Sequence, residues 1–233
     1  FGVASAEAWT QVWTSPGALY RLSPAFAADP GAVAAWLRKG EIEARSIHCE
    51  RYRKPRFESA LKQIRSLTTE EPGAAIEQAK QLCSSAGVAL VLVEELPRCR
   101  ASGATRWLNR HKAVIQLSFR YRTNDHLWFT LFHEAGHLLL TPEEKAFVDE
   151  PSSLSSTDPR EAQANEFAAN LLIPRDDYDQ FVNGMGTRRP TSAIIREFAD
   201  SIGIHPGIVV GRLQHDGLVP YGSSLNHLKC AVQ

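Results

Sequence analysis

Residues 124–140 read NDHLWFTLFHEAGHLLL, and this stretch decides how the rest of the chain is interpreted. Apolar side chains lie on nearly every side of a helical wheel drawn through it, which is typical of a helix buried in the centre of a protein. Asn124 or Asp125 can cap the start of such a helix, and Pro142 prevents its continuation. The stretch therefore predicts a central helix over about 125–140.

The pentapeptide His133-Glu134-Ala135-Gly136-His137 has the spacing of a metal-binding motif. Positions i and i+4 of an α-helix lie about 40° apart, so both imidazoles can reach one ion. Glu134 lies about 100° from His133, where it can take a proton from a water molecule at the ion. A chance occurrence would bury three polar groups without partners, at a cost of several kcal/mol. We therefore expect a metal site with Glu134 as general base.

A third ligand is expected from the later segment DPREAQANEFAANLL, residues 158–172. Asp158 and Pro159 are typical of a helix start, which predicts a helix over 159–172. Glu161 shares its face of this helix with Ala164 and Ala168, so its carboxylate points toward the core, where it requires a cation. A glutamate three residues after the cap can also serve as a capping-box acid, and that alternative stays open.

His126 is a rival ligand, because it lies on the same helix face as His133, two turns earlier. That distance favours a supporting or substrate-contacting role, and an ordinary core or surface histidine is the simpler alternative. Hydrolysis at such a site also needs a hydrogen-bond donor for the oxyanion. Tyr121, His126 and Arg120 are candidate donors and substrate contacts.

Glycine, proline and capping residues indicate where helices and strands begin and end in the rest of the chain. The first 70 residues are expected to be helical, with one helix that begins at Asp29-Pro30 and ends at Gly40, and another over 57–67. A helix over 72–85, strands over 88–93, 104–108 and 113–118, and helices over 176–181, 191–201 and 206–214 follow. Residues 141–158 are expected to form a loop. This order indicates an α+β fold, divided into a helical N-terminal region (1–70), the metal-site domain (71–190) and a C-terminal helical hairpin and tail (191–233).

The composition restricts the function classes. Lys plus Arg and Asp plus Glu number 26 each, which does not match the broad basic surface of a nucleic-acid binder. The basic runs at 51–54 and 120–122 are interpreted as solvated surface. The helix pair over 191–214 is an alternative DNA-binding element, but Arg196 and Arg212 are almost its only basic residues, so a plain hairpin is favoured.

Four cysteines occur far apart and without a Cys-x-x-Cys pair. A disulfide framework or a cysteine zinc site is therefore not expected, and a reducing cytoplasm is the expected location. No apolar run has the length of a membrane span, and no signal peptide is visible. We expect a cytoplasmic protein without membrane or direct nucleic-acid contacts.

Two segments together, FTLFHEAGHLLL at 129–140 and ExxANxFAAxLLIP at 161–174, resemble the ImmA/IrrE family of metallopeptidases. The resemblance implies Zn²⁺ as cofactor, with His133, His137 and Glu161 as its ligands. It also implies a minimal zincin-like domain, in which a small mixed three-stranded sheet packs on the active-site helix and a following helix supplies the glutamate. Zincins commonly hold substrate as an added strand at a sheet edge, which we place near 114–118.

Shorter stretches at 1–5, 36–41, 102–108 and 207–217 are similar to a subgroup fused to XRE-type helix-turn-helix domains, often labelled HigA-like antitoxins. That DNA-binding domain is absent here, and Phe1 lies about where it would end, so a longer natural protein is expected. The resemblance implies a stress-response or toxin–antitoxin function, with cleavage of a helix-turn-helix repressor as protein substrate. The alternative is a non-catalytic domain that senses a metal or small ligand within an XRE-family regulator or antitoxin.

Overall fold

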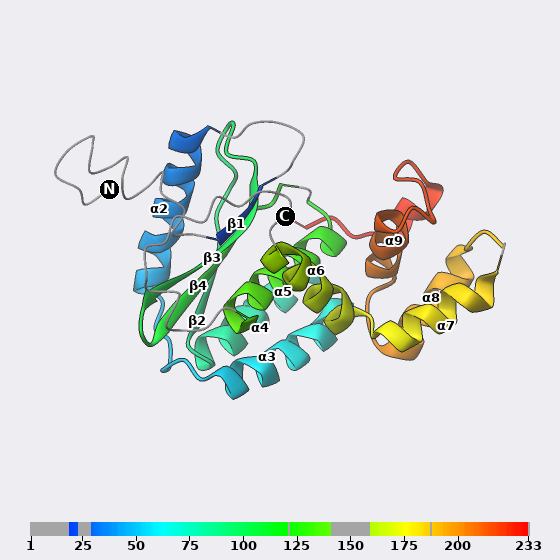
Figure 1. Ribbon diagram of the computed structural model, residues 1–233, viewed down its shortest axis with the longest axis horizontal. Coiled ribbons are helices and arrows are strands. Elements are labelled where there is room, and N and C mark those ends of the chain that lie inside the picture. The colour runs from blue at the N-terminus through cyan, green and yellow to red at the C-terminus, as the bar shows by residue number, and fades with distance from the viewer. Residues whose placement is uncertain (1–18, 23–28, 121, 141–158, 187, 233) are drawn as a thin grey trace.

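The structure is a computed structural model that describes residues 19–22, 29–120, 122–140, 159–186 and 188–232. Its described part is an α+β fold in layers, with helix α2 on one face of a sheet and helices α3, α4 and α5 on the other (Figure 1). This confirms the predicted fold class. The loop expected over 141–158 lies outside the described residues.

The sheet contains the three predicted strands, β2 (Val88–Leu92), β3 (Ala101–Asn109) and β4 (Lys112–Leu117). A fourth short strand, β1 (Leu19–Leu22), extends it, and the order is β1-β3-β4-β2. β2 runs parallel to β4 and the other pairs are antiparallel, so the sheet is mixed as predicted. Both faces of β2 are buried, which explains its uninterrupted apolar sequence.

Two sequence expectations differ from this sheet. β1 lies in the region that we expected to be helical, because its pairing with β3 is a long-range contact that local sequence patterns do not show. The edge expected near 114–118 is not an edge, because β4 lies between β3 and β2. Strand order, unlike strand position, depends on the whole fold.

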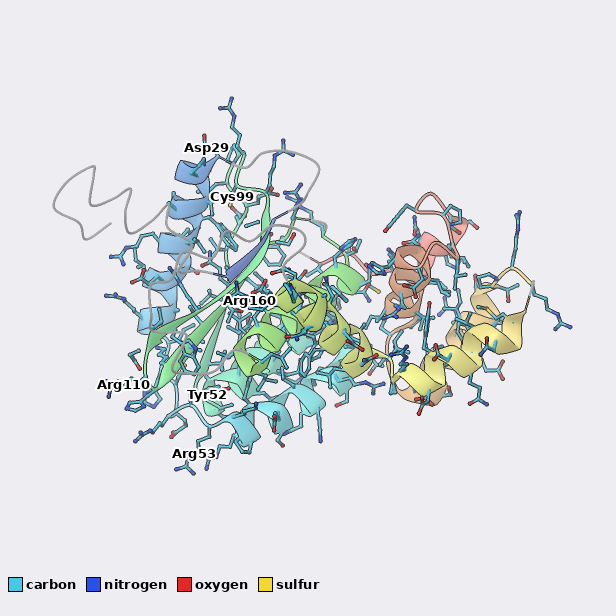
Figure 2. The ribbon with its side chains drawn as sticks, viewed as in Figure 1. Asp29, Tyr52, Arg53, Cys99, Arg110 and Arg160 are labelled. Atoms are coloured by element: carbon cyan, nitrogen blue, oxygen red, sulfur yellow. The ribbon has the colours of Figure 1, made fainter. Side chains whose placement is uncertain are left out.

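Helix α2 (Pro30–Ser46) covers one face of the sheet. Its N-cap is Asp29, as predicted, whose carboxylate accepts hydrogen bonds from the backbone of Gly31 (2.8 Å) and Ala32 (3.1 Å). Figure 2 marks Asp29 at this end of the helix. The prediction that Gly40 ends the helix is wrong, since the helix continues for six more residues. A Cβ atom at position 40 would collide with the Gln116 side chain of β4, so this glycine permits close packing instead.

Helices α3 (Lys54–Ser66), α4 (Pro72–Ser85) and α5 (Asn124–Leu140) pack on the opposite face of the sheet. Their core is continuous with that of the C-terminal helices. Phe57, Leu131 and Leu213 come from the three segments into which we divide the sequence, and all three belong to one buried cluster. The metal-site domain therefore shares its core with the regions before and after it.

Helix α6 (Pro159–Leu172) lies against α5 and has the predicted bounds. It is followed by α7 (Arg175–Met185), α8 (Ser192–Ile202) and α9 (Pro206–His215). Helices α7 and α8 extend away from the sheet, at the right of Figure 1, and are joined by stacked rings of Phe181 and Phe198 (centroids 4.1 Å apart). Gly203, with a φ of 67°, ends α8 in a left-handed cap. Short 3₁₀ turns occur at Leu67–Thr69 and Ser224–Leu228.

Candidate metal centre

Helix α5 presents His133 and His137 on one buried face, with 0% and 2% of their surface exposed. Their Nε2 atoms lie 3.0 Å apart. The Nδ1 atom of His133 lies 2.9 Å from Asn165 Oδ1 on α6. Because an amide oxygen only accepts hydrogen bonds, Nδ1 carries the proton and the Nε2 lone pair faces the other histidine. Two ring nitrogens that face each other in this way require a shared cation or proton.

Glu161 on α6 completes the cluster. Its carboxylate oxygens lie 3.3 Å from His133 Nε2 and 3.1 Å from His137 Nε2. Ligands at about 2.0–2.1 Å around a tetrahedral ion lie roughly 3.3 Å from one another. The three measured separations are close to that value, so the donor set fits one divalent ion. Among the described residues, these three form the one group of histidine, cysteine and acidic side chains with such spacing.

A close approach of α5 to α6 brings Glu161 within reach. A Cβ atom at Gly136 would lie 3.2 Å from Ala164 Cα and 3.1 Å from Phe167 Cδ1. The absence of a side chain at Gly136 and the small, fully buried Ala164 therefore let the helix backbones meet here. Figure 2 labels Arg160, the residue before Glu161, where the start of α6 crosses α5. The glycine within the pentapeptide is thus part of the site's construction.

Glu134 is fully buried beside this cluster, between α5 and β3. The Thr105 hydroxyl donates a hydrogen bond to its Oε2 atom (2.8 Å), whereas Oε1 has no hydrogen-bond partner among the described residues. A Cβ atom at Gly103 would lie 2.6 Å from Oε1, so β3 leaves room for this carboxylate only with glycine there. Burial raises the pKa of Glu134, although the two histidines and Thr105 oppose the shift.

The electrostatics of the cluster favour positive charge. Burial acts to raise the pKa of Glu161, but its contacts with His133 and His137 outweigh burial and hold that pKa far below its ordinary value. For His137, burial acts to lower the pKa, but the Glu161 and Glu134 carboxylates outweigh it and raise the pKa. Two carboxylates around two imidazoles thus attract cations, which favours a divalent metal held by His133, His137 and Glu161.

The structure separates the three candidate donors. Arg120 lies 3.3 Å from Glu95 in an ion pair. His126 lines a cavity between α5, α6 and α9. Tyr121 lies outside the described residues. An oxyanion role for these three residues stays a prediction.

Three residues of the site were not identified from the sequence: Asn165, Thr105 and Gly103. Asn165 follows Glu161 by four residues, so its place on the same helix face could have been read from the spacing alone. Thr105 and Gly103 lie two residues apart on one face of β3, opposite Glu134. Their role depends on the packing of β3 against α5, for which the sequence gives no local signal.

Comparison with known proteins agrees with this geometry. Residues 92–202 match the family model Peptidase_M78, described as the IrrE N-terminal-like domain. This segment contains β3, β4, α5 and α6, and with them every residue of the metal cluster. No curated protein matches the chain significantly. In the described residues, no helix is both long and apolar enough to cross a membrane. The match over residues 92–202 thus supports an ImmA/IrrE-family metallopeptidase.

Proposed function

We propose that the protein is a zinc-dependent endopeptidase. The observation that carries this proposal is the convergence of His133, His137 and Glu161, whose ligand atoms lie within 4.8 Å of one another, beside the buried Glu134. A structural zinc site has four protein ligands, whereas a catalytic site has three and keeps one position open. The described residues offer three ligands and one adjacent carboxylate, which is the catalytic pattern.

Zinc in this cluster supplies a Lewis acid that activates water and polarises a peptide carbonyl. Glu134 accepts the proton of the attacking water and returns it to the leaving amine. Thr105 fixes Oε2 of Glu134, so Oε1, which has no partner among the described residues, is the oxygen that takes the proton. Burial raises the pKa of Glu134, which suits a group that must first accept a proton and then donate it. Asn165 holds the ring of His133 in the orientation that ligation needs.

The substrate class that we propose is a protein, and the family resemblance supports a helix-turn-helix transcriptional repressor in the cytoplasm. Cleavage of such a repressor would release transcription under stress. A fused or partner DNA-binding domain of the XRE type would bring the site to that substrate. In this arrangement the domain itself needs no contact with nucleic acid or with a membrane.

Replacement of Glu134 by glutamine tests the proposal. We expect the Glu134→Gln protein to bind zinc with the same stoichiometry as wild type, measured by elemental analysis, because Glu134 is not a ligand. Hydrolysis should fall by roughly 10²–10⁴-fold, because the general base is lost. The substrates are a library of peptides from whole-cell protein and a co-expressed repressor, with products identified by mass spectrometry.

The matched control is Glu166→Gln, the same change at an exposed position of α6. It should keep both zinc and hydrolysis. Identical digests from wild type and Glu134→Gln would contradict the peptidase proposal. They would favour the alternative, a domain that senses a metal or ligand within a transcriptional regulator or antitoxin.

A further inference from the structure

A cavity of about 160 Å³ lies beside the metal centre, between α5, α6 and α9. It continues the two helix faces that carry the metal ligands. On α5, Phe129 precedes His133 by one turn, and their ring centroids lie 6.3 Å apart. On α6, Asn165 and Ala169 follow Glu161 by one and two turns and line the cavity. Asn165 also contacts His133 Nδ1 at 2.9 Å, so the metal centre and the cavity share a wall.

The wall of the cavity is largely apolar. Phe129, Ala169, Leu172, Ile173 and Ile208 line it from the three helices. An apolar cavity of about 150 Å³ in another protein is large enough to bind benzene. A space of 160 Å³ is therefore suited to a group of about the size of an aromatic ring. When an apolar group displaces water from such a cavity, few hydrogen bonds to the wall are lost and apolar surface is buried, which is favourable.

The charged residues at the cavity are already paired. Lys229 Nζ lies 2.6 Å from Asp125 Oδ2, with side chains that are 11% and 7% exposed. Arg212 Nε lies 2.8 Å from Asp216 Oδ2. An anionic ligand would have to break one of these pairs to find a counter-ion, which is costly in a buried setting. The paired cations therefore disfavour an anionic group, and the apolar wall favours a neutral one.

We propose that this cavity binds a neutral, apolar side chain of the peptide substrate, of aromatic-ring size, close to the bond that is cut. The inference rests on the proposed peptidase function and adds a preference to it. The continuity of the cavity with both ligand-bearing helices carries the argument, because a peptide held at the metal centre can place a neighbouring side chain there. Ala169 and Phe129 are then specificity-determining residues.

The first experiment measures occupancy without turnover. Fluorobenzene is titrated against the zinc-loaded full chain carrying Glu134→Gln, and its ¹⁹F line width reports binding. We expect saturable binding, weakened at least tenfold by Ala169→Phe, which fills the cavity. Ala169→Leu fills it less and should give an intermediate loss, and it serves if the larger variant does not fold. Ala193→Phe places the same ring at an exposed position on α8 and should not change binding.

The second experiment identifies the source of the side chain. Two synthetic peptide mixtures differ at one fixed position, phenylalanine or alanine. Only the phenylalanine mixture should displace fluorobenzene, and wild type should cleave it at least tenfold faster, a preference that Ala169→Phe removes. If the probe binds but neither mixture displaces it, the cavity serves a free small molecule and our assignment to substrate is overturned.

Equal cleavage of both mixtures by wild type would also overturn the inference, and would leave the peptidase proposal intact. If the phenylalanine mixture displaces fluorobenzene but is not cleaved, the cavity binds the side chain and the hydrolysis proposal fails. Equal fluorobenzene binding by the Ala169→Phe and Ala193→Phe proteins would show that the probe binds elsewhere, and would overturn the inference.

Discussion

The two ends of helix α5 carry buried polar clusters that are built differently. At the C-terminal end, His133 and His137 face Glu161 and Glu134. At the N-terminal end, Asp125 forms an ion pair with Lys229, which also donates to Gln214 Oε1 at 2.8 Å. We call the second group, Asp125, Lys229 and Gln214, the Asp125 cluster.

The difference lies in what neutralises each carboxylate. The Asp125 cluster contains its own cation, Lys229. In the metal cluster, the two carboxylates contact imidazoles and a threonine hydroxyl. Burial of a carboxylate without a fixed positive charge nearby costs desolvation free energy, and a bound divalent ion offsets this cost. One helix thus shows a structural and a ligand-dependent solution to the same problem.

The largest effect is expected from loss of a metal ligand. Mutation of a residue that only orients a metal ligand weakens metal affinity by about 10–100-fold. Loss of a ligand itself should cost more, so Glu161→Ala should weaken zinc binding by more than about 100-fold. Competition with a chelating dye measures the affinity. Glu166→Ala, an exposed change on the same helix, is the control. Full zinc occupancy in the Glu161→Ala protein under competition would remove Glu161 from the ligand set.

Breaking the Asp125 cluster should affect stability instead. Lys229→Met leaves the Asp125 carboxylate buried without its cation, which costs about 3–5 kcal/mol of unfolding free energy. Urea denaturation measures the loss, and zinc stoichiometry should stay unchanged. Addition of Asp125→Asn to this variant should restore most of the stability, because no unpaired charge remains. If Lys229→Met instead removed zinc, the two clusters would not be independent.

A smaller effect is expected from Asn165, a neutral residue that contacts the metal ligand His133. Asn165→Ala removes the acceptor at 2.9 Å from His133 Nδ1 and should weaken zinc binding by about 10–100-fold. Asn165→Asp, which keeps an acceptor oxygen, should retain most of the affinity. Asn170→Ala on the same helix is a control outside the cluster. Equal zinc affinities for wild type and Asn165→Ala would show that the ring of His133 is oriented by packing alone.

The smallest effect concerns a partly exposed cluster around Asp216. Burial acts to raise the pKa of Asp216, but hydrogen bonds from Tyr178 (2.6 Å), His215 and Arg212 (2.8 Å) outweigh it and lower the pKa. A lowered folded-state pKa stabilises the fold above the unfolded value of about 3.9, and this contribution is lost as the pH falls through the lower folded value. Because solvent screens the charge of this partly exposed carboxylate, Asp216→Asn should cost at most about 1 kcal/mol at neutral pH and less in acid.

Thermal or urea unfolding between neutral pH and about pH 3 tests this dependence. The exposed Asp200→Asn on α8 is the matched control and should follow the wild-type curve. A destabilisation by Asp216→Asn that stays constant down to acid pH would mean that the charge of Asp216 contributes nothing. The Asp216 side chain would then stabilise the fold through packing and not through its charge.

The sequence predicts the elements of this fold better than their contacts. Helices α4 and α6 have the predicted bounds because Pro72 and Pro159 mark their starts. Gly40 was misinterpreted because a glycine that ends a helix and one that admits a neighbour look alike in sequence. Only the position of Gln116 in β4, distant along the chain, distinguishes them.

The candidate site follows the same rule. The motif on α5 and the spacing on α6 predict which side chains approach each other, and His133, His137 and Glu161 do lie together. Gly103 and Thr105, which position Glu134, come from a strand whose packing against α5 is set by the whole fold. Short motifs therefore indicate the donor atoms, whereas the groups that orient them appear only in three dimensions.

The sheet order also determines where a foreign chain can join it. β4 occupies one side of β3, and residues 19–22 occupy the other, opposite Ala101–Thr105 and therefore next to the strand segment that positions Glu134. A visiting strand can reach that segment only by exchange with these four residues, whereas the outer side of β2 pairs with no described strand. Strand exchange at β3 and simple strand addition at β2 are thus separate events, with different energetic requirements.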